Sequence, residues 1–357
     1  MKAWTLYDID DIRFEDIEKP QIQAGEVLVR VRAAGICGSD APRIYRDGAH
    51  NMPLIPGHEF AGEVVETGDD VDIKWINKRV GIFPLIPCKS CISCVNKQYE
   101  MCKHYNYLGS RIDGAFAEYV AVPAWNLIEL PDGVSFEQAA MLEPMSVAVH
   151  AMRRCMDCDV IEKAKNENST VLVYGLGTIG LMLTMFLLEA GIKNLLVIGN
   201  KASQYNTAIR LGITDENYCD SKANDVISWI NEKTNGNGVD FAFECVGRSE
   251  TVAQLIDLTA SDAKVMLIGN PYSDMTLDKR IYWKILRNQL TVFGTWNSSF
   301  THEEDDDWHY VLDRLSNGKI DPQMFITHRF SLDRLEKGLH IMRDKSEEYI
   351  KEMVVMQ

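Results

Sequence analysis

The stretch Thr170-Val-Leu-Val-Tyr-Gly175-Leu-Gly-Thr-Ile-Gly180 places an apolar run directly before three glycines in the spacing G-x-G-x-x-G. Because a helical pattern follows, this spacing predicts the strand, turn and helix of a dinucleotide-binding site. Gly175 and Gly177 would allow a tight turn and the close approach of a pyrophosphate, and Gly180 would let helix and strand pack closely. Thr178 and Ile179 would begin the helix. A turn in an α/β sheet that binds no ligand is the alternative.

Strand and helix patterns alternate on both sides of this stretch. Further apolar runs typical of buried strands lie at 195–198, 239–243 and 264–268, with helical patterns between them. This alternation predicts a doubly wound parallel sheet, the Rossmann fold. We expect the dinucleotide-binding domain to comprise residues 146–294.

The second apolar strand ends without an acidic residue. In NAD-specific folds an Asp or Glu about 20 residues beyond the fingerprint commonly binds the ribose 2′-hydroxyl. Here those positions hold Gly199, Asn200 and Lys201. The glycine leaves space and the lysine offers a positive charge for a 2′-phosphate, which favours NADP over NAD. The alternative is a surface lysine in a domain that binds NAD.

The N-terminal part of the chain is rich in short β-strand patterns. They are punctuated by glycine and proline, and lie at 26–32, 62–68, 79–83 and 118–122. Such a pattern predicts a partly closed β-barrel. Beyond about residue 295 the strand–helix alternation stops, so we expect one catalytic domain formed by 1–145 and 295–357.

Four cysteines lie close together in the spacing C-x2-C-x2-C-x7-C, at Cys88, Cys91, Cys94 and Cys102. Four thiolates at this spacing predict one tetrahedral zinc. The site would be structural, because four protein ligands leave no position for a substrate. Disulfides are the alternative, which the absence of a secretory signal pattern disfavours.

A second, open metal site can be assembled from distant segments. Cys37, His58 and a carboxylate offer soft, intermediate and hard ligands, which suit zinc with a vacant position. Glu59, next to His58, and Glu143, before a proline, compete for the third place. Each residue alone has a structural explanation, as a small buried residue, a core histidine or a helix end. Their combination with the surrounding motifs favours the metal site.

Composition limits the possible partners. The chain has 357 residues, 46% of them hydrophobic, and a net charge of −15. This length suits two domains, and so acidic a surface disfavours nucleic acid and anionic membranes. No stretch is long and apolar enough to predict a membrane span. Nine cysteines without a secretory signal indicate a reducing compartment, so we expect the cytoplasm.

These motifs together resemble the zinc-dependent medium-chain dehydrogenase/reductase family over essentially the whole chain. The matching elements are Cys37-Gly-Ser-Asp40, Gly57-His-Glu-Phe-Ala-Gly62 and Glu143-Pro144. Within the family, the chain is most similar to the polyol branch, through segments 37–50, 84–88, 107–114 and 284–290. The resemblance implies an α/β protein with a GroES-like barrel domain and a Rossmann domain, one catalytic and one structural zinc, and NAD(P).

The resemblance also implies a mechanism. Zinc would act as a Lewis acid on the substrate hydroxyl, and hydride would pass to the nicotinamide. Ser39 could relay a proton to solvent, and Asp40 could orient His58, although a loop aspartate without a role is the alternative for Asp40. Glu59 and Glu143 are expected to exchange roles, one ligating the metal directly while the other reaches it through water or when substrate leaves. The sequence does not decide which.

The implied substrate is a sugar alcohol, such as galactitol 1-phosphate, whose secondary alcohol becomes a ketone. Possible substrate contacts are Arg43, Tyr45, His50 and Arg287, with surface salt bridges as the alternative for the arginines and packing for Tyr45. Two other functions stay open: a dehydrogenase of unphosphorylated polyols or diols, of the sorbitol, xylitol or butanediol type, and a non-catalytic NADP-binding protein. A homodimer or homotetramer is expected, with residues 290–296 as a contact.

Overall fold

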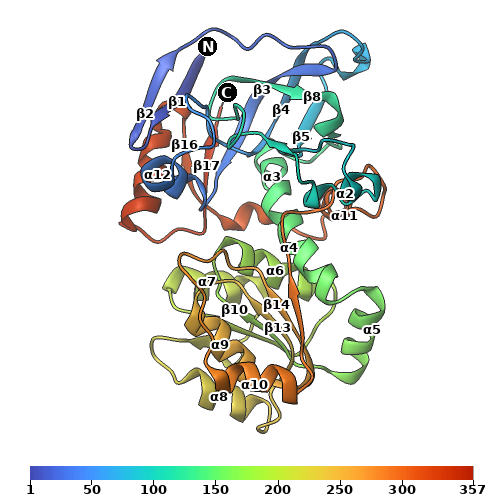
Figure 1. Cartoon of the computed structure of the whole chain (residues 1–357), viewed down its shortest axis with the longest axis vertical. Coiled ribbons are helices and arrows are strands. Elements are labelled where there is room, and N and C mark those ends of the chain that lie inside the picture. Colours follow the sequence, from blue (N-terminus) through green and yellow to red (C-terminus); the bar gives the residue numbers. More distant parts are fainter. Residues whose placement is uncertain (357) are drawn as a thin grey trace. The chain divides into compact units, whose positions relative to one another are not determined.

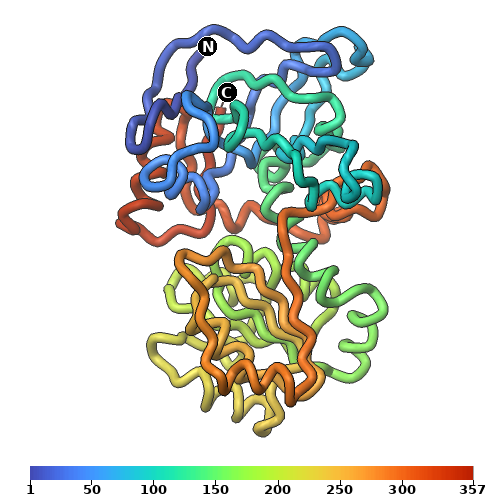
Figure 2. Tube along the Cα trace, in the orientation of Figure 1, coloured from blue at the N-terminus to red at the C-terminus, as the bar shows by residue number. Residues whose placement is uncertain are grey.

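The computed structural model describes residues 1–356 and divides the chain into two compact units. Unit 1 comprises Met1–Pro144 with Ser299–Gln357, and unit 2 comprises Met145–Ser298. Both ends of the chain, blue and red in Figure 2, belong to unit 1. Among the described residues, none of the helices combines the length and the apolar character that a membrane crossing needs.

A six-stranded parallel sheet forms the centre of unit 2 (Figure 1). Its strand order is β12-β11-β10-β13-β14-β15, so the chain starts in the middle and winds outward on both sides. This is the doubly wound Rossmann topology, and it confirms the predicted fold. The strands are β10 (Val171–Tyr174), β11 (Leu195–Gly199), β12 (Tyr218–Asp220), β13 (Val239–Glu244), β14 (Thr259–Leu267) and β15 (Thr291–Gly294).

Helices connect these strands. They are α6 (Thr178–Glu189), α7 (Ala202–Leu211), α8 (Val226–Lys233), α9 (Ser249–Asp257) and α10 (Lys279–Arg287), while α5 (Cys158–Glu167) precedes β10. Most residues of α6 are buried, as expected for a helix that is apolar on nearly all sides, whereas α10 buries only Ile281. α6 contacts α7 and α9 contacts α10, as expected for two helical layers on a doubly wound sheet.

Unit 1 is built on a seven-stranded sheet in the order β16-β17-β3-β4-β5-β9, with β8 also paired to β3. The central strand β3 directs Val27, Val29 and Val31 into the core, each at most 1% exposed. The C-terminal strand β17 pairs antiparallel with β3. The strands of this sheet are β3 (Glu26–Ile36), β4 (Glu59–Thr67), β5 (Arg79–Ile82), β8 (Tyr119–Pro123), β9 (Leu127–Glu129), β16 (Ile326–Phe330) and β17 (Lys351–Val355).

Smaller elements complete unit 1. Two small antiparallel pairs are β1 (Lys2–Asp8) with β2 (Asp11–Asp16) and β6 (Leu85–Ile86) with β7 (Asn106–Tyr107). The helices are α1 (Asp40–Pro42), a π-helical turn at Arg43–Asp47, α2 (Ile92–Val95), α3 (Phe136–Ala140), α11 (Asp307–Ser316) and α12 (Leu335–Asp344). α4 (Leu142–Cys155) carries the chain from unit 1 into unit 2.

Candidate metal and dinucleotide sites

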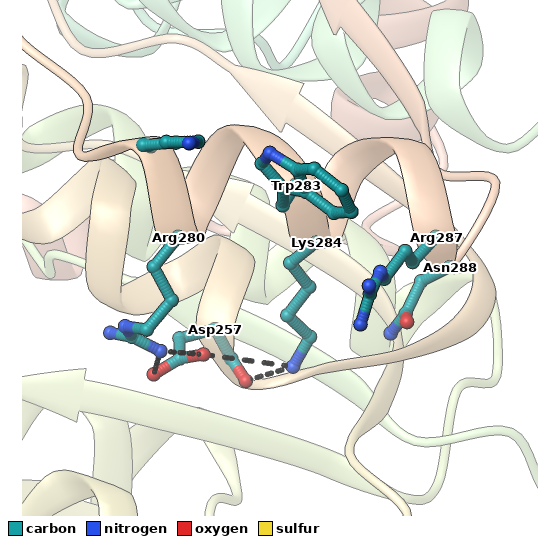
Figure 3. A pocket seen from close by; sticks show the side chains of 7 residues that line it. Asp257, Arg280, Trp283, Lys284, Arg287 and Asn288 are labelled. Carbon is teal, nitrogen blue, oxygen red and sulfur yellow. Dashed lines mark hydrogen bonds and ion pairs between the residues drawn. The ribbon is translucent and has the colours of Figure 1, made fainter.

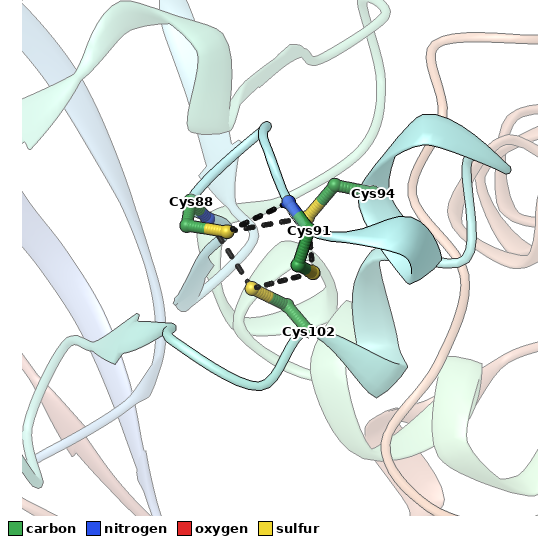
Figure 4. A group of neighbouring side chains, drawn as sticks. All are labelled: Cys88, Cys91, Cys94 and Cys102. Atoms are coloured by element: carbon green, nitrogen blue, oxygen red, sulfur yellow. Dashed lines mark hydrogen bonds between the residues drawn. The ribbon is translucent and has the colours of Figure 1, made fainter.

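The four clustered cysteines direct their sulfur atoms toward one point (Figure 4). The Sγ atoms of Cys91 and Cys94 are 3.6 Å apart, and both Cys88–Cys94 and Cys91–Cys102 are separated by 3.9 Å. A tetrahedral zinc with Zn–S bonds of about 2.3 Å requires sulfur atoms about 3.8 Å apart. The donor set and its spacing therefore fit a closed zinc site.

The local backbone prepares these thiols for a metal. The N–H groups of Cys91 and Cys88 donate to the sulfurs of Cys88 and Cys102, at 3.4 and 3.3 Å. Hydrogen bonds from Ser90 and neighbouring N–H groups lower the pKa of Cys88 to about 5, whereas burial raises the pKa of Cys94 to about 12. Metal binding to such a cluster must therefore release protons.

An aromatic cluster anchors the cysteine lobe to the rest of unit 1. The rings of Tyr99 and Trp125 meet edge to face with centroids 5.0 Å apart, and the Lys89 ammonium lies 4.8 Å from the centre of the Trp125 ring. Lys97 and Glu303 add an ion pair of 2.5 Å. All nine cysteines carry free thiols. The lobe is therefore not cross-linked by disulfides, which suits a metal-stabilised loop.

The open site forms where β3 ends and β4 begins. These strands pair antiparallel with Gly35 opposite Glu59, so Cys37, just after β3, comes beside His58 and Glu59. One ligand atom from each of these three side chains lies within 4.8 Å of the others. His58 and Glu59 are buried and Cys37 is half-buried. The thiol, imidazole and carboxylate together fit a catalytic zinc.

The two competing carboxylates have different partners. Glu59 belongs to the three-residue group and forms an ion pair with the ammonium of Lys351. Glu143, in the first turn of α4, is outside that group and accepts a hydrogen bond of 3.1 Å from the Tyr107 hydroxyl. Burial raises the pKa of Glu143 to about 7. The ring of Tyr107 also meets the His58 ring edge to face, with centroids 5.7 Å apart.

Sequence reasoning missed both Lys351 and Tyr107 as parts of this site. Lys351 lies in no recognisable sequence motif, and only the pairing of β17 with β3 brings it to Glu59. Tyr107 belongs to segment 107–114, which resembles the polyol branch, but no sequence pattern around Tyr107 predicts its contact with Glu143.

Asp40 is fully buried and connects three neighbours. One oxygen accepts a hydrogen bond of 2.9 Å from the Cys37 N–H, and the other lies 2.6 Å from the Arg43 guanidinium and 3.5 Å from His58 Nδ1. Burial alone would raise the pKa of Asp40, but His58, Arg43 and the Cys37 N–H outweigh it and hold that pKa below its usual value. Asp40 therefore stays ionised and faces His58.

Three other residues near the open site have distinct surroundings. Ser39 is half-buried at the start of α1, and its carbonyl accepts a hydrogen bond from the Arg43 N–H. Tyr45 packs against α12, where Arg343 lies 4.8 Å from the centre of its ring. His50 is exposed in the following loop.

The structure does not bring Arg287 to the dinucleotide fingerprint. Thr291 of β15 aligns with Lys264 of β14, so Arg287, four residues earlier in the chain, lies at the amino edge of the parallel sheet. Gly175 follows the carboxyl end of β10, at the opposite edge. Arg287 instead stacks on Trp283 at 4.5 Å and lines a surface pocket beside α10 (Figure 3). Arg287 therefore lies away from the glycine turn, and its suggested contact with substrate stays a prediction.

The glycine fingerprint has the geometry of a dinucleotide turn. Gly175 has φ +99°, and a Cβ there would lie 2.5 Å from Val246; a Cβ at Gly180 would lie 1.9 Å from the Gly175 carbonyl oxygen. Gly177 precedes α6, and a Cβ there would meet no atom within 4 Å. The space at Gly177, just before Thr178 and Ile179 of α6, is therefore open, as close approach of a pyrophosphate requires.

The end of β11 explains the missing acid. A Cβ at Gly199 would lie 2.6 Å from the Tyr218 hydroxyl and 3.0 Å from Gln204 Oε1, so an acidic side chain would have to displace both. The N–H of Asn200 donates to the same Gln204 oxygen at 2.9 Å, and Lys201 follows at the start of α7. This arrangement fits a cofactor that needs no carboxylate at this point.

Two protein families match this chain. The alcohol dehydrogenase GroES-like domain family matches residues 23–132, and the zinc-binding dehydrogenase family matches residues 178–317. Galactitol 1-phosphate 5-dehydrogenase of Escherichia coli K12 is 31% identical over 338 residues, which is 94% of each chain. The chain belongs to the zinc-dependent medium-chain dehydrogenase/reductase family. The motifs therefore predicted the family correctly, and the protein is a dehydrogenase.

Other relatives of this dehydrogenase agree in fold. Sorbitol dehydrogenase of Bacillus subtilis is 27% identical over 360 residues, covering 99% of this chain and 97% of its own. The crystal structure of galactitol-1-phosphate dehydrogenase from Escherichia coli superposes with a TM-score of 0.89, at 28% identity over the whole of both chains. A zinc-binding dehydrogenase from Sinorhizobium meliloti 1021, solved with NADP bound, has a TM-score of 0.87 at 26% identity and covers 99% of each chain.

Proposed function

We propose that this dehydrogenase oxidises a secondary alcohol of a sugar alcohol to the ketose, and catalyses the reverse reduction, with NAD(P). The observation that carries the proposal is the group of Cys37, His58 and Glu59, whose ligand atoms lie within 4.8 Å of one another. Its relatives include enzymes named for galactitol 1-phosphate and for sorbitol.

The chain's own residues divide the work of this reaction. When bound, zinc supplies Lewis-acid polarisation of the substrate oxygen and NAD(P) exchanges hydride with the substrate carbon. Cys37, His58 and Glu59 would hold the metal, and Asp40, whose carboxylate lies 3.5 Å from His58 Nδ1, would orient the His58 ring. Ser39, two residues after Cys37 and half-buried, transfers the hydroxyl proton toward solvent. Zinc in the four-cysteine lobe has a structural role only.

Glu143 is the second acid of the site. Its carboxyl group would supply a further ligand when the ligand set around the metal changes, and burial raises its pKa to about 7. Tyr107 holds it close to His58.

A phosphorylated polyol such as galactitol 1-phosphate is the first substrate to test. The 31% identity to the galactitol 1-phosphate enzyme supports it. Arg43 and exposed His50 follow Cys37 in the chain, and Tyr45 lies between them. The second candidate is an unphosphorylated polyol, because Arg43 is already paired with buried Asp40 at 2.6 Å and has less charge to offer a phosphate.

NADP is the coenzyme we infer. No acid that would repel a 2′-phosphate stands at Gly199, and Lys201 lies two residues after it. The NADP-bound relative from Sinorhizobium meliloti supports this choice.

We further propose a homodimer or homotetramer formed through β15 and α10, and action in the cytoplasm. β15 is an outer strand of its sheet, and apolar side chains around it are exposed: Tyr282, Leu286, Val292 and Trp296, by 40 to 61%. Exposed apolar side chains beside an outer strand favour pairing with a second copy. Nine cysteines without a disulfide suit a reducing compartment.

The proposal is tested by initial rates with galactitol 1-phosphate and with galactitol, each with NAD and with NADP. Turnover of the phosphate ester alone would establish the phosphorylated substrate, and the faster coenzyme would decide between NAD and NADP. If neither these compounds nor other hexitols, pentitols and diols reduce either coenzyme, the proposed function is wrong.

A further inference from the structure

A buried lysine contacts one of the three residues proposed to hold the catalytic metal. Lys351 is the first residue of β17, and its side chain is only 3% exposed. Its ammonium contacts Glu59 Oε2 and donates a hydrogen bond of 3.0 Å to the Ile36 carbonyl. The Glu59 side chain is 2% exposed, so water does not screen the pair.

The fold makes room for this ion pair at Gly35. A Cβ at Gly35 would lie 2.2 Å from Glu59 Oε2 and 2.9 Å from Lys351 Cε. Gly35 is not among the glycines with positive φ, so the backbone conformation does not require glycine there. Its missing side chain instead provides the space in which the carboxylate meets the ammonium.

The ion pair changes what Glu59 can give to a metal. A carboxylate whose oxygen is bound by an ammonium group has less negative charge to offer a second cation. A metal held by Cys37 and His58 must therefore compete with Lys351 for Glu59. A weakly held ligand leaves readily, and its departure gives the substrate oxygen a position, which a catalytic zinc needs.

We propose that Lys351 is a positioning residue that competes with the metal for Glu59 and thereby keeps Glu59 an exchangeable ligand. The inference depends on the proposed function, because it requires a metal held by Cys37, His58 and Glu59. It predicts that loss of the ammonium tightens metal binding while slowing turnover.

The test is a cobalt(II) titration of metal-depleted protein, followed by visible absorption without substrate or coenzyme. We expect Lys351→Met to bind cobalt at the open site about tenfold more tightly, since residues behind metal ligands change affinity by about this factor. Lys351→Arg keeps the charge and should stay close to wild type. Cobalt in the four-cysteine lobe gives a separate thiolate spectrum, which serves as the reference for correct folding.

A second background isolates the route through Glu59. In Glu59→Gln, whose amide is a poor metal ligand, Lys351→Met should change cobalt affinity no further. Unchanged or weaker cobalt binding in Lys351→Met, or the same gain in the Glu59→Gln background, would overturn the inference.

If Lys351→Met does not fold, Gly35→Ala separates the pair by a different route, because the added Cβ displaces Glu59 Oε2 from the ammonium. Tighter cobalt binding in Gly35→Ala supports the inference, and unchanged or weaker binding overturns it. Failure of the wild-type open site to bind cobalt at all would instead refute the proposed function.

Discussion

Replacement of Glu352 by glutamine should make the protein more stable at alkaline pH. Glu352 follows Lys351 on β17 and is completely buried, and neither carboxyl oxygen has a hydrogen-bond partner among residues 1–356. It lies opposite Ile36 and close to Gly338. Burial raises the pKa of this carboxyl group to about 8, although Lys351 partly opposes the rise.

The sign and size of the effect follow from this pKa. Below pH 4.5 the carboxyl group is protonated in both folded and unfolded chains, so its titration costs no stability. Between pH 4.5 and about 8 only the unfolded chain loses the proton, and stability falls as pH rises. Each pH unit in that window lowers the free energy of unfolding by about 1.4 kcal/mol, so the upper limit over the whole window is about 5 kcal/mol. Local relaxation reduces this loss to about 2–3 kcal/mol.

The assay is urea unfolding of wild type and Glu352→Gln at pH 5 and pH 8.5, followed by tryptophan fluorescence. The advantage of the variant should be about 2–3 kcal/mol larger at pH 8.5 than at pH 5. Glu66→Gln, which changes an exposed residue of β4, is the matched control and should show no such dependence. If wild type and Glu352→Gln lose equal stability between the two pH values, Glu352 is not a buried neutral acid and the reasoning fails.

Three further predictions concern the two metal sites and the coenzyme. Cys94→Ser should lose the zinc of the four-cysteine lobe and keep the metal of the open site, as metal analysis will test; loss of both would mean that the sites are not independent. Gly180→Ala should prevent unit 2 from folding, because its Cβ would lie 1.9 Å from the Gly175 carbonyl oxygen. Gly177→Ala should fold, but a fluorescence titration should show that it binds coenzyme about tenfold more weakly. Equal coenzyme affinity in Gly177→Ala would contradict the open-space argument. Lys201→Ala should raise KM for NADP about tenfold with little effect on KM for NAD, and an equal change for both would remove the lysine from coenzyme selection.

Features set by short sequence spacings could be predicted. Gly175, Gly177 and Gly180 specify a turn between one strand and one helix, so the Rossmann sheet followed from the chain itself. The four cysteines between residues 88 and 102 converge because only short segments of chain separate them.

Features set by pairing between distant strands could not be predicted. The sequence alone does not rank Glu59 and Glu143, whereas the structure places Glu59 with Cys37 and His58 and gives the two acids different partners, Lys351 and Tyr107. The place of Arg287 could not be predicted for the same reason, because the direction of β15 relative to β14 decides which edge of the sheet it occupies.

The central claim is that Cys37 holds the metal on which polyol oxidation depends. Its most direct test is the initial rate of NAD(P)H formation from galactitol 1-phosphate by Cys37→Ser, with bound zinc measured on the same sample. The account predicts a rate at least about 100-fold below wild type and one zinc per chain, in the four-cysteine lobe. Wild-type turnover by Cys37→Ser, with or without the second zinc, would contradict it.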